Sequence, residues 1–361
     1  MNSPLHTAQL DNARKIPANG APAMQYIGVD TILTLLRAQG VEHFLSGLTA
    51  CIEADFRRWE TFEKSARLAS HSKGGVIELM PTSDGTLYAF KYVNGHPANT
   101  KAGKLTVTAF GVLADVATGY PLLLAEMTIA TGLRTAATSV MAAKLLARKN
   151  SHVMTMIGLG AQSEFQALAF RAEMGIRELR VYDIDPAATK KFIDNLRPYD
   201  FSVLPMDSVR EAVRGADIVT TATAAKTRAT ILHADMIAPG AHINAIGGDC
   251  PGKTEISRDL LEQTKVFVEY PPQSRIEGEI QQLNQDSKVT QIWHVLTGRA
   301  PGRISNQDIT LFDSVGFAIE DFSTLRYLRD LLAAQAKSHD LDLIPALTNP
   351  KNLFGLIAAP V

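Results

Sequence analysis

Cysteine is almost absent from this 361-residue chain, in which only Cys51 and Cys250 occur, far apart in the sequence. Two distant cysteines provide neither a disulfide framework nor a cysteine-rich metal site, and a reducing cytoplasm is the compartment that we expect. No apolar run approaches the roughly 18 residues that cross a bilayer, and the N-terminus lacks the apolar core of a secretion signal. We therefore expect no membrane partner.

An excess of charge of one sign is also missing, since 36 basic residues stand against 37 acidic ones and the net charge is -1. Such a balance gives no general attraction to nucleic acid, so a small-molecule partner is expected. The nine histidines form no H-x-x-x-H or H-E-x-x-H arrangement. We therefore expect no catalytic metal.

The segment V-M-T-M-I-G-L-G-A-Q-S-E-F at 153–165 joins an apolar run of strand length to a helical stretch through two glycines. Gly158 and Gly160 allow a tight turn and the approach of a pyrophosphate to the start of a helix. Asp183 follows Gly160 by 23 residues, where an acid binds a ribose 2′-hydroxyl and disfavours a 2′-phosphate. This β-α-β unit predicts NAD rather than NADP. Ser163 departs from the pattern, because a third Gly or Ala usually stands there.

The alternation of strands and helices continues beyond this unit. Asp185-Pro186 is typical of a helix start, and apolar runs follow at 201–206, 217–223, 241–248 and 266–270. Runs without strict alternation are typical of parallel strands that are buried on both faces. We predict a doubly wound, Rossmann-type NAD domain over 137–330. Its ligand is expected at the carboxyl ends of the strands.

The preceding region, 24–136, has a different pattern, and residues 1–23 are expected to be a loose extension. Two hairpins are predicted, with turns at Asp84-Gly85 and near Thr118-Gly119, so this is an α+β domain with an antiparallel sheet. With a two-residue loop at Asp84-Gly85, residues that face each other across the two strands have residue numbers that sum to 169. This register puts Glu78 opposite Lys91. The C-terminal helix after Gly316, which is rich in apolar residues through Leu332, is expected to cross back to this domain, and the domain limits assign about 331–361 to it.

Three cations of this region stand in apolar or small-residue surroundings: Arg67, Lys91 and Arg134. Glu78 and Lys91 are open to two interpretations, an exposed cross-strand ion pair or charges that are covered and hold a ligand. Arg134 lies in T-I-A-T-G-L-R-T-A-A-T-S, where a carboxylate partner would explain an arginine. The three cations could hold one anion.

The segment G-G-D-C-P-G-K-T-E at 247–255 predicts a tight loop at the mouth of the parallel sheet. The carboxylate of Asp249 is expected on the nicotinamide side of this loop. The alternative is an acid that satisfies loop amides in an Asx-turn. Cys250 is not expected to be a nucleophile, because no base is placed near it by the sequence.

Several longer motifs resemble the ornithine cyclodeaminase and mu-crystallin family, in its bacterial form, from about residue 25 to 356. They include S-A-R-L-A-S-H-S, F-K-Y-V-N-G-H-P-A-N-T, G-A-Q-S-E-F-Q-A-L-A-F, I-G-G-D-C-P-G-K-T-E, R-I-E-G-E-I-Q-Q-L and F-D-S-V-G-F-A-I-E-D. The N-G-H-P and D-C-P-G-K-T-E runs are far more specific than the glycine pattern. Leu159 and Ala225 depart from the family, in which Asn and Asp are frequent at these positions.

The resemblance implies roles for individual residues. Asp249 matches the catalytic acid or base. Substrate-binding positions are Arg67, Lys91 and Arg134 for the carboxylate, Glu78 for substrate amines, and Val315. Cofactor-binding positions are Thr106, Gly158, Gly160, Ala161, Gln162, Asp183, Thr223, Ile243, Asn244, Ala245, Ile246, Lys253 and Ser314.

The resemblance also implies an activity. L-ornithine would be oxidised to an imine by NAD⁺, closed into a ring with loss of the α-amine as ammonia, and reduced again to L-proline. The alternatives are lysine cyclodeamination, a reductase or amino-acid dehydrogenase of the same family, or a non-catalytic, crystallin-like binding protein. A homodimer, assembled through the sheet of the first domain, is expected.

Overall fold

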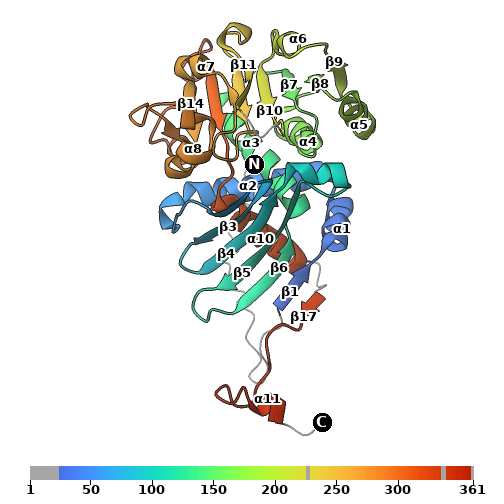
Figure 1. Ribbon diagram of the computed structural model, residues 1–361, viewed down its shortest axis with the longest axis vertical. Coiled ribbons are helices and arrows are strands. Elements are labelled where there is room, and N and C mark those ends of the chain that lie inside the picture. Colours follow the sequence, from blue (N-terminus) through green and yellow to red (C-terminus); the bar gives the residue numbers. More distant parts are fainter. Residues whose placement is uncertain (1–23, 225–227, 335–338, 359–361) are drawn as a thin grey trace, which may run out of the picture.

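The computed structural model describes residues 24–224, 228–334 and 339–358, so the extension 1–23 and Ala225 lie outside the described residues. Two large sheets lie one above the other in Figure 1, and helices α2 (Val41–Arg57), α3 (Thr128–Leu146) and α10 (Ala318–Ala334) lie between or against them. None of the described helices is both long and apolar enough to cross a membrane.

The lower sheet has seven strands in the order β17-β1-β6-β5-β4-β3-β2. Its pairings are antiparallel except for β1 with β6, so the expected antiparallel sheet is confirmed. The strands are β1 (Met24–Ile27), β2 (Leu68–Ser72), β3 (Gly75–Ser83), β4 (Leu87–Gly95), β5 (Val107–Asp115), β6 (Pro121–Glu126) and β17 (His339–Leu341). The accompanying helices are α1 (Val29–Gln39), η1 (Trp59–Thr61) and η2 (Pro97–Ala102).

The β3–β4 hairpin differs in register from the prediction. Met80, not Glu78, stands opposite Lys91, so partner numbers sum to 171. The cause is Asp84, whose carboxylate accepts the N–H groups of Thr86 and Leu87 and makes Gly85-Thr86 the loop. A shift of two residues keeps side chains on the same face, so Glu78 and Lys91 still share the buried face.

The upper sheet has eight parallel strands in the order β15-β14-β16-β12-β10-β7-β8-β9, which confirms the doubly wound prediction. The strands are β7 (Val153–Ile157), β8 (Glu178–Tyr182), β9 (Ser202–Pro205), β10 (Ile218–Thr221), β12 (His242–Ala245), β14 (Lys265–Val268), β15 (Thr290–Gln291) and β16 (Thr310–Asp313). Its helices are α4 (Ser163–Met174), α5 (Pro186–Leu196), α6 (Val209–Val213), η3 (Ala234–Met236), α7 (Arg258–Gln263), α8 (Pro271–Glu277), η4 (Glu279–Gln282) and α9 (Ile292–Leu296).

Local signals explain several of these boundaries. Asp185 caps α5, since its side chain accepts the N–H of Ala187, and Pro186 occupies the first turn as expected. A small parallel sheet of β11 (Arg228–Leu232) and β13 (Thr254–Ile256) was not predicted. Strand β13 directly follows the loop that carries Asp249, and its pairing with β11 anchors the end of that loop.

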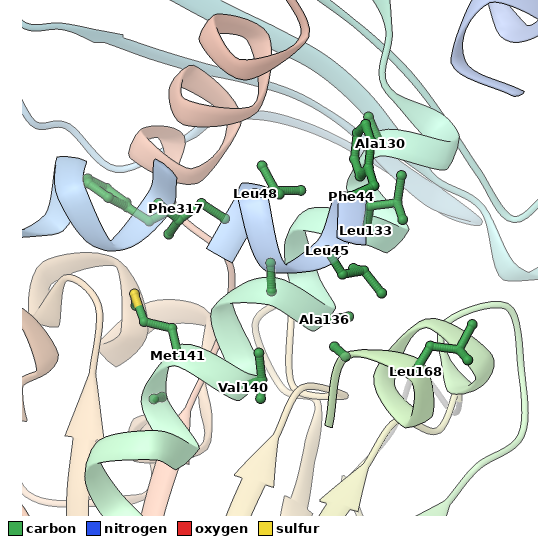
Figure 2. Close-up of a cluster of buried hydrophobic side chains, with 14 of the residues drawn as sticks. Phe44, Leu45, Leu48, Ala130, Leu133, Ala136, Val140, Met141, Leu168 and Phe317 are labelled. Carbon is green, nitrogen blue, oxygen red and sulfur yellow. The ribbon is translucent and has the colours of Figure 1, made fainter. Parts of the chain in front are cut away.

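The hydrophobic core continues from one sheet to the other. Figure 2 shows Leu45 and Leu48 of α2 beside Leu133, Ala136 and Val140 of α3. All five side chains are fully buried. Burial of this size is the main stabilising contribution to a fold, and here it joins the two domains through α3.

Two helices do not respect the expected limits between the domains. The limit between 136 and 137 falls inside α3, which is one continuous helix. The limit at residue 330 leaves α10 in the nucleotide domain, but α10 packs on β3, β4 and β5 of the lower sheet, as expected for the helix that follows Gly316. Within the described residues, 331–361 is not one helix, because β17 pairs with β1 and only α11 (Gly355–Ala358) follows.

Candidate active site

The glycine turn after β7 forms an open cradle. Gly158 has a φ of 91°, and a Cβ there would lie 2.7 Å from the carbonyl oxygen of Ala222, so the position requires glycine. A Cβ on Gly160 would meet nothing within 4 Å. This space adjoins the first residues of α4, where backbone N–H groups have no partner within the helix. The arrangement fits a phosphate group.

Side chains at the start of α4 complete the cradle. Ala161 is exposed, and the buried Oε1 atom of Gln162 has no hydrogen-bond partner among the described residues. Ser163 is fully buried and donates its hydroxyl to the carbonyl of Gly160 at 2.8 Å. The departure at Ser163 is therefore accommodated by a hydrogen bond.

Asp183, at the end of β8, lies beside this turn. One carboxylate oxygen accepts the N–H of Leu159 at 2.6 Å, and the other accepts the N–H of Asp185 at 2.8 Å. Neighbouring strands β7 and β8 thus bring the acid to the glycines, as the spacing predicted. The side chain of Leu159 is fully buried, so it is the backbone of this residue that faces the acid.

Several of the remaining residues that the resemblance assigns to cofactor binding lie away from the glycine turn in sequence, on β12 and just before β5. Ile243, Asn244 and Ala245 are fully buried inside β12, and Ile246 is half-buried where the strand ends. Thr106 lies just before β5 in the other domain, where its carbonyl accepts the N–H of His96. Side chains of the three β12 residues face the core, which leaves the backbone beyond Ala245 to reach a ligand.

Thr223 follows β10 and is held by a residue that was not predicted, Glu255. The N–H of Thr223 donates to Glu255 Oε1 at 2.8 Å, and the threonine hydroxyl donates to the same oxygen. Burial raises the pKa of Glu255, although the hydroxyl of Thr223 opposes this. The carboxyl of Glu279 accepts the N–H groups of Glu255 and Ile256, so the start of β13 is tied to η4.

The three predicted cations lie close together, and each has a carboxylate partner. Lys91 donates to Asp321 at 2.8 Å, and Arg134 donates to Glu320 at 2.7 Å and lies 3.3 Å from Asp321. Lys91 and Arg134 therefore share one acid. Buried charges require such partners, because an isolated one is very unfavourable in a protein interior.

Arg67 joins this cluster through the backbone that follows β16. Its guanidinium donates to the carbonyls of Val315 at 2.6 Å and Gly316 at 2.8 Å, and to Glu78 at 3.1 Å. A Cβ on Gly316 would lie 2.5 Å from Arg134 Nη1, so this glycine lies directly against Arg134. We call Arg67, Lys91 and Arg134 the cation cluster.

Burial keeps several groups of this region titrating near neutrality. Together with the charge of the neighbouring Arg134, it lowers the pKa of Lys91 to about 8, although Asp321 opposes this. It raises the pKa of Glu320 to about 8 and that of Glu269 to about 7. Glu269 accepts the hydroxyl of Ser314 at 2.7 Å, which holds the segment that carries Val315. Such groups are able to exchange protons at physiological pH.

Asp249 lies on the loop between β12 and β13, with a side chain that is 57% exposed. Its carboxylate is 3.2 Å from Lys253, which is buried. A cavity of about 410 Å³ lies between this loop, at Cys250-Pro251, and the turn from β2 to β3 at 71–76. The loop therefore faces the lower-sheet domain at the turn between β2 and β3.

Sequence reasoning missed the acids that accompany the cations, Glu277, Glu320 and Asp321. A signal for two of them was present, because Glu320 and Asp321 interrupt the otherwise apolar start of α10. Acids on a buried helix face require cations. Glu277 ends α8, and no local pattern distinguishes it from an exposed helix-end acid.

Comparison with known proteins identifies the family. The model of the ornithine cyclodeaminase/mu-crystallin family matches residues 29–336. A protein of Agrobacterium fabrum named ornithine cyclodeaminase is 60% identical over 332 residues, covering 92% of this chain and 94% of that protein. A Brucella suis protein of the same name is 59% identical over 332 residues, covering 92% and 93%.

Solved structures agree with this result. A lysine cyclodeaminase structure, which describes recognition of L-lysine, L-ornithine and L-2,4-diaminobutyric acid, superposes with a TM-score of 0.87 and 28% identity, covering 92% of this chain and 99% of that one. An archaeal alanine dehydrogenase dimer with bound NAD gives 0.81 and 30%, covering 89% and 99%. The expected resemblance is confirmed, and the chain belongs to the ornithine cyclodeaminase/mu-crystallin family.

Proposed function

We propose that the protein is an ornithine cyclodeaminase, which converts L-ornithine to L-proline and ammonia. The observation that carries the proposal is the 60% identity with a protein of that name over 92% of the chain. The site agrees with it, since a buried cation cluster, several acids and a nucleotide cradle lie at one interdomain region. Such a combination suits an amino acid that carries one carboxylate and two amines.

NAD is the proposed cofactor. The open space at Gly160 and the glycine-only approach at Gly158 fit a pyrophosphate, and Asp183 suits a ribose 2′-hydroxyl. The unpartnered Oε1 of Gln162 is an acceptor and would suit a hydroxyl group of the cofactor. When bound, NAD supplies an acceptor for the hydride of the substrate α-carbon and the donor that returns it. Thr223 after β10, Ser314 after β16 and Lys253 before β13 are proposed to line the same site.

The cation cluster is proposed to bind the substrate carboxylate. Each cation already holds an acid, and the Nε atoms of Arg67 and Arg134 lie 3.0 Å from Glu277 and 3.3 Å from Asp321 in ion pairs without hydrogen-bond geometry. A planar guanidinium can donate two parallel hydrogen bonds to a substrate carboxylate, which these looser contacts would give way to. Val315, whose carbonyl fixes Arg67, would then lie beside the bound amino acid.

Asp249 is proposed as the acid or base. An alkylamine has a reference pKa of ~10.4, so its proton must be removed before the nitrogen can act as a nucleophile. Asp249 is exposed enough to reach a ligand and lies on a loop anchored by Glu255 and Glu279. If the site holds both substrate amines near one carbon, the attack of one amine on that carbon is an intramolecular step and needs no encounter between separate molecules.

One labelling experiment tests the function. The protein is incubated with L-ornithine that carries ¹⁵N only at the α position, together with NAD⁺ below stoichiometric amount. Labelled ammonia and unlabelled L-proline are expected. Label retained in proline would contradict the proposed loss of the α-amine. Steady accumulation of NADH would instead indicate a dehydrogenase.

Lysine cyclodeamination is the second candidate, favoured by the TM-score of 0.87 with a lysine cyclodeaminase. L-lysine in the same assay distinguishes the two, because its ring product has one more carbon than proline. We expect L-ornithine to have the higher kcat/KM, as the 60% identical relative carries the ornithine name.

Asp183→Ser is expected to weaken the preference for NAD over NADP by about tenfold or more. The carboxylate now beside Leu159 N–H would repel a 2′-phosphate, and serine removes that charge. Binding of each nucleotide, followed by the quenching of intrinsic fluorescence, measures the ratio. A control is Asp200→Asn, which removes an exposed acid near the end of the same sheet and should leave the ratio unchanged.

A homodimer through the lower sheet is proposed from its outer face. Leu79, Tyr92 and Phe110 form one cross-strand row on this face, and Leu79 and Phe110 are each 42% exposed. The rings of Tyr92 and Phe110 stack with centroids 5.0 Å apart. A contiguous apolar surface of this kind is typical of a protein interface.

Phe110→Lys is expected to shift the protein from dimer to monomer, because a buried, unpaired ammonium opposes association. Light scattering during gel filtration measures the mass. Ile304→Lys places the same charge on another exposed apolar residue, far from this sheet in sequence, and should leave the mass unchanged. A Phe110→Lys protein that keeps the dimer mass would contradict this interface.

A further inference from the structure

Three buried acids connect the end of β16 to the end of β10. Asp313 accepts the backbone N–H of Glu279 at 2.9 Å, and Glu279 accepts the backbone N–H of Glu255 at 2.8 Å. Glu255 in turn accepts the N–H of Thr223 at 2.8 Å. Each of the three acids is at most 1% exposed. We call Asp313, Glu279 and Glu255 the acid chain.

The start of the loop that carries Asp249 lies directly against the acid chain. A Cβ on Gly247 would lie 2.2 Å from Glu255 Oε2, and a Cβ on Gly248 would lie 3.0 Å from Glu279 Oε1. Neither glycine has a positive φ. The close approach of the carboxyl groups, and not backbone conformation, therefore explains the two glycines.

The acid chain is compatible with burial because its middle member is neutral. Burial raises the pKa of Glu279 to about 9, and the charge of Asp313 reinforces this. A proton on Glu279 at neutral pH removes the repulsion that three carboxylates in series would have. The chain thus needs no bound cation, and its hydrogen bonds to backbone N–H groups hold separate segments together.

Glu255 contacts two parts of the proposed site. Its Oε1 atom accepts both the N–H and the hydroxyl of Thr223, which is proposed to line the cofactor site. The same carboxyl group lies against Gly247, two residues before Asp249. A displacement of this carboxyl group would therefore change the position of the Asp249 loop relative to the end of β10.

We propose that Glu255 is a positioning residue that fixes the Asp249 loop against the cofactor side of the site. This proposal rests on the proposed function and adds to it a residue that does not contact the substrate. Glu255 acts through its shape and its hydrogen bonds to Thr223, so the acid or base stands at a fixed place relative to the cofactor. The competing explanations are proton transfer by Glu255 itself and a general contribution to stability.

Replacement of Glu255 by two different residues separates positioning from proton transfer. Glu255→Ala removes the support of Gly247 and the acceptor for Thr223, and is expected to lower kcat for proline formation by about tenfold to a hundredfold. Glu255→Gln keeps the shape and one acceptor oxygen, and should keep kcat within about threefold of wild type. If Glu255 transferred a proton, glutamine would lower kcat as much as alanine does.

A double-mutant cycle with Asp249→Asn separates positioning from general stability. If Glu255 acts through Asp249, Glu255→Ala should lower kcat by less than about twofold once Asp249 is asparagine. Asp217→Ala is the matched control, because Asp217 accepts the N–H groups of His152 and Val153 at the opposite end of β10. This control should lower the unfolding temperature and leave kcat unchanged.

Thiol labelling reports the position of the loop without any turnover. Cys250 follows Asp249 and is half-buried, whereas burial raises the pKa of Cys51 to about 12 and keeps this second cysteine unreactive. In the protein saturated with NADH, Glu255→Ala is expected to increase the rate of iodoacetamide labelling at Cys250 by about tenfold. Glu255→Gln and Asp217→Ala should label within about twofold of the wild-type rate.

Three results would overturn the proposal: an unchanged labelling rate in Glu255→Ala, a Glu255→Gln protein that behaves like Glu255→Ala, or an equal loss of kcat in both backgrounds of the cycle. A wild type that forms no proline would refute the cyclodeaminase instead. The labelling rates require no proline formation, so they would still decide whether Glu255 holds the loop in place.

Discussion

Asp249→Asn is expected to lower kcat for proline formation by about a hundredfold to ten-thousandfold, the range for removal of a general acid or base. Asparagine fills the same space and can still accept a hydrogen bond from Lys253, which lies 3.2 Å from the carboxylate. It cannot take up a proton at neutral pH. Release of ¹⁵N ammonia from α-labelled L-ornithine measures the loss.

Two controls make this result specific to the chemistry. NAD affinity and thermal unfolding should stay unchanged, because the Asp249 side chain is 57% exposed and its loop is anchored by other residues. Asp235→Asn removes an exposed acid that pairs with Arg210 and should leave kcat unchanged. Proline formation within a factor of about three of wild type in Asp249→Asn would refute its role as acid or base.

Lys91→Met is expected to reduce the free energy of unfolding by about 3 kcal/mol, since loss of one partner leaves a buried charge uncompensated. Lys91 and Asp321 are each 1% exposed, and methionine keeps most of the apolar length of lysine. Arg134 Nε, 3.3 Å from Asp321, retains part of the compensation. Urea unfolding followed by circular dichroism measures the change.

A second variant distinguishes charge from packing. Lys91→Met/Asp321→Asn removes both charges and should recover part of the lost stability, because no unpaired carboxylate remains. Lys190→Met breaks an exposed pair with Asp194 and should leave the unfolding midpoint unchanged. Equal destabilisation in the single and double variants would show that the lost packing, and not the charge, is responsible.

The nucleotide half of the site followed closely from local sequence. Strands β7 and β8 are consecutive and adjacent in the sheet, so Asp183 had to approach Gly158 and Gly160 once both runs became strands. The register of the β3–β4 hairpin was missed for an equally local reason. The Asp84 side chain selected the loop, and a pattern of apolar residues cannot report that hydrogen bond.

Local sequence patterns could not identify the acids that pair with the cation cluster. Glu320 and Asp321 belong to α10, which returns to the lower sheet almost two hundred residues after Arg134. Glu277 meets Arg67 across a comparable separation. Each acid alone resembles an ordinary helix charge, and its significance comes from burial against a cation.

The order of amino acids was enough to specify two sheets of different kind, the glycine cradle and the cations Arg67, Lys91 and Arg134, because strand period, turn chemistry and isolated charges are short-range properties. The packing of α10 onto the lower sheet then selected which acids neutralise those cations. Burial and charge pairing are set by distances between residues far apart in the chain, so only the folded protein establishes them.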